Sequence, residues 1–237
     1  MEAKTKDLWV FVETNSEGAA LNVGLELLTP GRMMDDKQGG QLVAVVIGNN
    51  VDAAVAAANA QGADKIIVVD GPEYTYYTTD AYTIALTTLV EKYGPTSMMI
   101  GATNNGRDLG PRVACRLKTG LTADCTALDI DEESGNIAWT RPAFGGNLMA
   151  TILCPDHRPQ IGTVRPGVFK KAEADAAHTA EVIKEDISFP VEQIRTQILE
   201  FIKNEGEELI DLEGADIIVS GGRGVRSEEH TSELQSR

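Results

Sequence analysis

The sequence predicts an α/β protein: a doubly wound, mostly parallel sheet with an antiparallel β extension, followed by the first strand of a truncated second α/β domain. Up to residue 117, apolar runs of strand length alternate with segments of helical spacing, and the connections between them are short. That alternation is typical of parallel strands joined by right-handed helical crossovers. After residue 126 the spacing changes to alternating apolar and polar residues, which is typical of antiparallel hairpins.

The first strands and helices are predicted from residues 8–100. Residues 8–13 (LWVFVE) are a continuous apolar run, as expected for a strand inside a parallel sheet. Residues 22–37 have helical spacing, but Pro30 interrupts it, because proline removes a backbone donor and clashes with the preceding turn. We therefore expect a kink or a break at Pro30. The elements predicted next are a strand at 41–47, a helix at 51–60, a strand at 65–69, a helix at 79–92 and a strand at 97–100.

Residues 100–126 (IGATNNGRDLGPRVACRLKTGLTADCT) are predicted to contain a strand end, a glycine turn, a short helix and the start of a new extended region. Asp108 is a natural N-cap, Pro111 would lie in the first helical turn, and Gly120 would close the helix. A strand, a glycine turn and a helix N-terminus in this order are the usual place for a phosphate or nucleotide in an α/β fold.

The second half of the chain begins with a predicted hairpin. Leu128 and Ile130 alternate with aspartates, residues 133–136 are turn-forming, and residues 137–140 are predicted to form the second strand of the hairpin. Strands at 147–154 and 160–165 are expected to complete the antiparallel extension, which ends near Phe169. The predicted domains are an amino-terminal domain at 1–169, a linker at 170–212 with a strand at 180–183 and a helix at 191–203, and the start of a second domain at 213–225 with a strand at 216–219.

Composition excludes several classes of function. The formal net charge of −15 argues against nucleic acid or an anionic membrane as a partner. No apolar run is long enough to span a bilayer, and the first residues lack the features of a secretory leader, so we expect a cytoplasmic protein. The three cysteines form no CxxC pair and the three histidines have no metal-ligand spacing, so we expect buried thiols and no metal site.

Four segments together resemble the alpha subunit of electron transfer flavoproteins. They are GATNNGRDLGPRVA followed by TGLTADCT, TRPAFGGN at 140–147, RPQIGTVRPGVF at 158–169, and ADIIVSGGRG at 215–224. The resemblance implies a nucleotide-alpha-hydrolase-like amino-terminal domain and pairing with a beta subunit. It also implies that the complete protein is an electron carrier, not an enzyme, that shuttles electrons on FAD. Acyl-CoA dehydrogenases or related flavin-dependent dehydrogenases would be its donors or acceptors.

The expected cofactor contacts are Ser220, Gly221, Gly222, Arg223 and Gly224. Glycines directly after an apolar strand let backbone N–H groups approach a pyrophosphate, which an arginine can neutralise. The resemblance implies that Arg223 matches an FAD-contacting position. The family's GASRAA and GQTG segments are absent, and residues 226–237 resemble a translated sequencing adapter, so we expect this polypeptide to bind no FAD.

The expected subunit interface includes Asn104, Arg107, Asp108, Arg141 and Arg165. Residues 101–108 nearly match a P-loop, but Arg107 replaces the lysine and Asp108 would repel phosphate. A nucleotide-binding module of the stress-protein type and a purely structural pairing domain stay open as alternatives. Three arginines precede prolines, which hold them extended, and they either converge on a partner or are unrelated strand ends: Arg141, Arg158 and Arg165.

Overall fold

The computed structural model describes residues 2–143, 148–196, 198–200 and 217–221. The chain divides into two compact units, residues 1–197 and residues 198–237. The described residues of the second unit, 198–200 and 217–221, form neither a helix nor a strand. All helices and strands described below therefore belong to the first unit.

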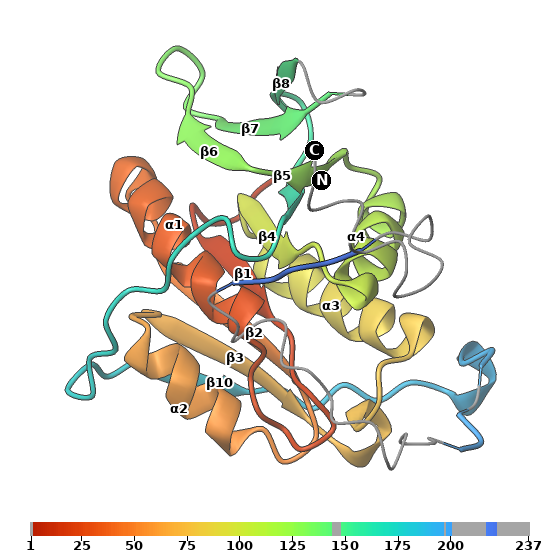
Figure 1. Cartoon of the computed structure of the whole chain (residues 1–237). Helices are drawn as coiled ribbons and strands as arrows, with labels where there is room; N and C mark the ends of the chain where they lie inside the picture. Colours follow the sequence, from red (N-terminus) through yellow and green to blue (C-terminus); the bar gives the residue numbers. More distant parts are fainter. Residues whose placement is uncertain (1, 144–147, 197, 201–216, 222–237) are drawn as a thin grey trace. The chain divides into compact units, whose positions relative to one another are not determined.

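The first unit is built on a parallel sheet of seven strands among the described residues, in the order β10-β3-β2-β1-β4-β9-β5 (Figure 1). All six neighbouring pairs are parallel. The strands are β1 (Leu8–Val12), β2 (Leu42–Gly48), β3 (Lys65–Asp70), β4 (Ser97–Gly101), β5 (Leu121–Cys125), β9 (Gln160–Val164) and β10 (Glu181–Lys184). The helices are α1 (Asn22–Gln38), α2 (Asp52–Ala60), α3 (Thr79–Tyr93) and α4 (Asn104–Leu117), with short 3₁₀ turns η1 (Pro72–Tyr74) and η2 (Val191–Gln193).

Helices cover both faces of this sheet, which explains why its central strands are continuous apolar runs. Along β1, alternate side chains enter two different cores: Trp9 and Phe11 pack with α3 and α4, whereas Leu8, Val10 and Val12 pack with α1 and α2. Every residue of β1, β2 and β4 is buried. The predicted doubly wound α/β fold is confirmed.

A small antiparallel sheet forms the predicted extension, with β7 between its neighbours: β6 (Ala127–Ile130), β7 (Ile137–Pro142) and β8 (Met149–Ile152). It packs on the main sheet through Trp139, whose ring lies against Gly162 of β9; a Cβ atom at Gly162 would come within 2.2 Å of that ring. The assignment of residues 160–165 to the extension is wrong. β9 returns to the main sheet and pairs in parallel with β4 and β5.

Two helix predictions near prolines need correction. α1 runs without a break through Pro30, because side chains before and after it, including Leu27, Leu28 and Met34, are buried in the same core. α4 begins at Asn104 and not after Asp108. Its N-cap is Thr103, whose hydroxyl accepts a hydrogen bond from the Gly106 N–H at 3.0 Å.

The C-terminus of α4 and the helix predicted at 191–203 also differ from the sequence prediction. Lys118, in the left-handed region at φ 54°, caps the C-terminus of α4 in place of Gly120. The helix expected at 191–203 is not present in residues 191–196 and 198–200, where only η2 forms. There the Arg195 backbone N–H donates a hydrogen bond to the side chain of Asp80, in α3, at 3.1 Å.

The strand expected at 180–183 is present as β10, paired with β3 at the edge of the sheet. The domain boundaries at 169 and 212 stay a prediction.

Candidate functional site

The strand order reverses at β1, because β2 and β3 lie on one side of it and β4 lies on the other. At such a point α/β folds commonly bind nucleotides, beside the carboxyl ends of the strands. Glu13 follows β1, is 7% exposed and holds this position. Its carboxylate accepts hydrogen bonds from the Thr103 hydroxyl at 2.6 Å and from the Asn105 amide at 2.7 Å. A buried carboxylate therefore lies beside the carboxyl end of β1, and its negative charge would repel a phosphate there.

The glycines behind β4 close this edge further. A Cβ atom at Gly106 would lie 1.8 Å from the carbonyl oxygen of Gly101, and one at Gly101 would lie 2.6 Å from the Val23 side chain. The first turn of α4 thus packs directly on the end of β4. The loop after β1 covers the neighbouring strand end, because a Cβ at Gly18 would lie 2.3 Å from the Asn50 carbonyl oxygen. The glycines serve close packing here, and the geometry argues against a phosphate cradle.

Asp108 lies inside α4 and binds its own fold. Its Oδ2 accepts hydrogen bonds from the hydroxyls of Tyr77 at 2.6 Å and Thr79 at 2.5 Å, which joins α4 to the start of α3. Burial, followed by the hydrogen bond to Asp108, raises the pKa of Tyr77. Asn104, the first residue of α4, is exposed.

The structure brings two of the expected interface arginines, Arg107 and Arg165, to one carboxylate, Asp124 of β5. Arg165 donates two hydrogen bonds to it, at 3.1 and 2.6 Å, and Arg107 lies 3.8 Å away. The charge of Arg141 also acts on it. Sequence reasoning missed Asp124. The available signal was an aspartate near the end of an otherwise strand-like segment.

Arg158 does not join this cluster. Its guanidinium donates to the carbonyl oxygens of Cys154 and His157, each at 2.9 Å, and to the side chain of Asn136 at 2.7 Å. It also donates to the carbonyl oxygen of Pro155 at 3.2 Å. Arg158 therefore fastens the loop before β9.

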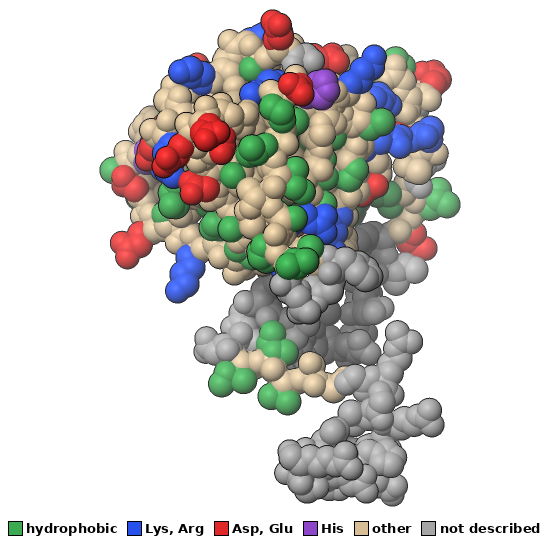
Figure 2. Space-filling model, turned by 90° about the horizontal axis from the view of Figure 1, so that it is seen from above, with side chains coloured by type: hydrophobic (Ala, Val, Ile, Leu, Met, Phe, Trp, Pro, Cys, Tyr) green, Lys and Arg blue, Asp and Glu red, His purple; other side chains and the backbone are tan. Residues whose placement is uncertain are grey.

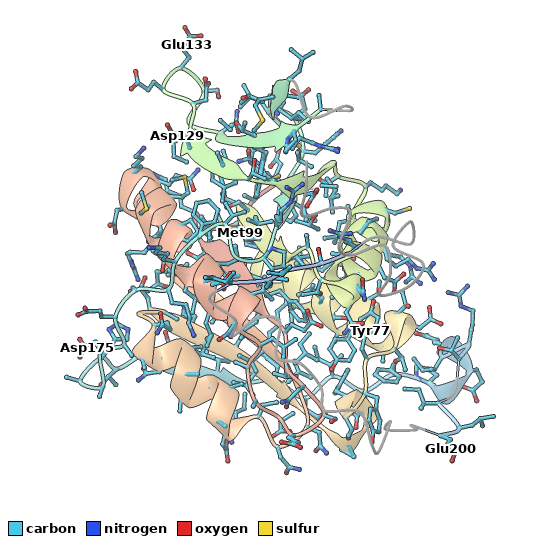
Figure 3. The ribbon with its side chains drawn as sticks, in the orientation of Figure 1. Tyr77, Met99, Asp129, Glu133, Asp175 and Glu200 are labelled. Carbon is cyan, nitrogen blue, oxygen red and sulfur yellow. The ribbon has the colours of Figure 1, made fainter. Side chains whose placement is uncertain are left out.

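Exposed apolar side chains lie on both faces of β8, the outer strand of the small sheet, and directly beside its two ends. Four large side chains there are 39% to 70% exposed: Leu148, Met149, Ile152 and Leu153. The small sheet lies at the top of Figure 1, and Figure 2 looks down on that end. Hydrophobic side chains are visible across this face, with acidic side chains mainly on the left and basic ones mainly on the right. The acidic residues Asp129 of β6 and Glu133 of its turn are exposed (Figure 3), and the Asp129 carboxylate accepts a hydrogen bond from Lys37 of α1 at 2.7 Å.

The expected cofactor residues are only partly described. Ser220 and Gly221 are exposed and lie in no helix or strand, and Ile217 and Val219 before them are 84% and 94% exposed. The other three residues lie outside the described part: Gly222, Arg223 and Gly224.

The described residues contain neither a metal-ligand cluster nor a membrane-spanning helix. No group of three or more His, Cys, Asp or Glu side chains among them could hold a metal ion. No helix in that part of the chain is both long and apolar enough to span a bilayer. Cys125 is buried, and burial raises the pKa of its thiol to about 12, whereas Cys115 is exposed.

Comparison with known proteins gives consistent matches. The model of the electron transfer flavoprotein domain family matches residues 8–190. Protein FixB of Clostridium saccharobutylicum is 49% identical over 228 residues, which cover 96% of this chain and 67% of that protein. The electron transfer flavoprotein subunit alpha of Thermoanaerobacterium thermosaccharolyticum is 51% identical over 220 residues, 93% of this chain and 66% of that protein. The acryloyl-CoA reductase electron transfer subunit beta of Anaerotignum propionicum is 44% identical over 244 residues, 93% of this chain and 66% of that protein. The chain thus spans about two thirds of the length of these relatives.

Proposed function

This chain belongs to the electron transfer flavoprotein family, and we propose that it is the amino-terminal part of an alpha subunit that pairs with a beta subunit. The observation that carries this proposal is the extent of the family match, which covers nearly all of the first compact unit. The relatives named as electron transfer subunits support a role as a carrier and not as an enzyme. The buried Glu13 carboxylate and the tightly packed glycines after β4 do not support the alternative of a nucleotide-binding module.

In the complete protein, the proposed cofactor is FAD and the proposed electron partners are flavin-dependent dehydrogenases. The name of the Anaerotignum relative, an electron transfer subunit of an acryloyl-CoA reductase, supports an enzyme that acts on a coenzyme A thioester as the electron partner. The proposed contacts to the FAD pyrophosphate are Ser220, Gly221, Gly222, Arg223 and Gly224. The proposed location is the cytoplasm, which suits the three free cysteines.

The surface proposed to meet the beta subunit combines the β8 apolar side chains with the arginines beside it. In the β7–β8 ladder Arg141 lies opposite Ala150 and Trp139 lies opposite Ile152, so Arg141 and Ile152 share one face of the small sheet, whereas Met149, opposite Pro142, lies on the other face. Large apolar side chains exposed together commonly mark a protein interface. The residues Asn104, Arg107, Asp108, Arg141 and Arg165 are kept in this proposal.

Co-expression with an electron transfer flavoprotein beta subunit, followed by size exclusion, tests the pairing. We expect one co-eluting complex, and we expect Met149→Glu to weaken it by about tenfold, because a charge would be buried in an apolar contact. Met33→Glu is the matched control, since Met33 on α1 is 56% exposed and Met149 is 57% exposed. Two chains that elute separately at about micromolar concentration would overturn the proposal.

A further inference from the structure

Asp124 lies at an irregularity of β5 and holds two arginines at the surface. The β5–β9 register shifts between Thr122 and Cys125, and Asp124 between them has a φ of 61°. Arg165 Nε lies 3.1 Å from Asp124 Oδ1, and Arg165 Nη2 lies 2.6 Å from Oδ2. Arg107 Nη2, from α4, lies 3.8 Å from Oδ1. One carboxylate therefore joins side chains from two separate elements.

The backbone at Asp124 adopts a conformation that costs free energy for most residues. Among the described residues, two other non-glycine residues have positive φ, namely Asn50 between β2 and α2 and Lys118 at the C-cap of α4. Connections and helix ends commonly use this conformation. Asp124 alone of the three lies within a strand, where its N–H donates to the Thr163 hydroxyl at 2.9 Å. Strand irregularities of this kind re-aim side chains and are frequent at functional sites.

The cluster around Asp124 has more positive than negative charge. Hydrogen bonds from Arg165 lower the pKa of the Asp124 carboxyl below its ordinary value, and the charges of Arg107 and Arg141 act in the same direction. The side chains of Arg107 and Arg165 are 60% and 46% exposed, so their remaining N–H donors face solvent. On a chain of net charge −15, this local excess of cations favours a negatively charged partner.

We propose that Asp124 is a positioning residue that presents Arg107 and Arg165 to carboxylate side chains of the beta subunit. This inference rests on the proposed function and adds the chemistry of the contact. The guanidinium fork matches a carboxylate with two parallel hydrogen bonds, provided that its orientation is held. Asp124 supplies that orientation for Arg165 through both oxygens. Arg141 lies opposite Ala150 of β8 and so shares a face of the small sheet with the exposed Ile152.

The test measures affinity for a purified electron transfer flavoprotein beta subunit by titration calorimetry, at low and at high salt. The double variant Arg107→Gln, Arg165→Gln should bind at least about tenfold more weakly at low salt, and its affinity should depend less on salt. Arg116→Gln is the matched control, because Arg116 is also an exposed arginine of α4. Its affinity should stay within about twofold of wild type.

Asp124→Asn separates positioning from simple charge. Asparagine tolerates the left-handed conformation but carries no charge, so the variant is more positive than wild type. A purely electrostatic patch would then bind a carboxylate-rich partner more tightly, whereas loss of positioning should weaken binding by about threefold or more. Melting curves of each variant show that the fold is kept. If wild type binds and the Asp124→Asn variant binds equally well or more tightly, this inference is overturned but the proposed function is not. The same holds if wild type binds and the double variant is unaffected. No binding by wild type overturns the proposed function and this inference with it.

Discussion

Asp80, near the start of α3, is a buried carboxylate held between two arginines from distant parts of the chain. The Arg195 guanidinium donates to both of its oxygens, at 3.0 and 2.7 Å, and Arg112 of α4 donates at 3.1 Å. The hydrogen bonds from Arg195 outweigh the opposite effect of burial and lower the pKa of Asp80 to about 2. Asp80 therefore fastens residues 190–195 to the two helices.

Asp80→Asn should lower the free energy of unfolding by roughly 1–3 kcal/mol at neutral pH, because both arginines lose their charged partner. The folded pKa of about 2 lies below the ordinary 3.8, so this stabilisation is present above pH 3.8 and is lost as the pH falls towards 2. Urea unfolding of both proteins at neutral pH and at decreasing acid pH measures the effect.

The gap between wild type and Asp80→Asn should therefore narrow as the pH falls. Asp156→Asn, at an exposed site, is the control and should change stability little at any pH. A gap that stays constant down to the lowest pH would mean that the carboxylate charge contributes nothing and that only shape matters. No sequence pattern indicated this contact, because Asp80 and Arg195 are 115 positions apart.

At the scale of elements, α1 shows that tertiary packing can hold a helix through a proline. Pro30→Ala restores a backbone N–H that can donate to the carbonyl of Glu26, one turn earlier. The gain is reduced because ring atoms are lost from a buried site and the unfolded chain becomes more flexible. We expect the free energy of unfolding to rise by about 1 kcal/mol, measured by urea unfolding. A less stable variant would mean that the packing of the proline ring outweighs the missing hydrogen bond.

The first turn of α4 depends on Gly106. In Gly106→Ala the new methyl group would lie 1.8 Å from the Gly101 carbonyl oxygen, a backbone atom that cannot move cheaply. We expect a loss of about 3 kcal/mol or more in unfolding free energy. Gly120→Ala is the control, because the nearest atom to its Cβ would be Cys154 Sγ at 3.7 Å. Equal melting temperatures for the two variants would contradict the proposed packing of α4 on β4.

These elements also show what local patterns can and cannot predict. The central strands were predictable, because each is an apolar run buried on both faces. The start of α4 was not, since Thr103 and Asp108 are both good N-caps and the choice depends on Glu13, ninety positions away. The place of β9 was not either, because its partners β4 and β5 are selected by tertiary packing against Trp139.

At the scale of the whole molecule, the candidate interface was partly predictable. The Arg-Pro pairs indicated surface arginines, and two of the three, Arg141 and Arg165, act on Asp124. The third, Arg158, binds its own loop. The apolar side chains of β8 could not be assigned to the surface from sequence, because an apolar strand is normally buried. In the structure β8 is an edge strand that pairs with β7 only, among the described strands, and its large apolar side chains are exposed.

A polypeptide of these 237 residues should bind no FAD when purified by itself. Tight binding needs contacts to the pyrophosphate, the ribityl chain and both ring systems inside a cleft that excludes water. In the first unit, the buried Glu13 carboxylate and the packing of Gly106 on Gly101 disfavour a phosphate at the carboxyl ends of β1 and β4. In the second unit, Ser220 and Gly221 are exposed. One exposed arginine–phosphate pair contributes about 1 kcal/mol or less, against roughly 8 kcal/mol for micromolar affinity.

After incubation with FAD and desalting, the protein should be colourless, with no flavin absorbance. Near-stoichiometric flavin would reveal a site that the closed edge of the first unit does not account for, and Glu13→Gln would then test whether the flavin binds there.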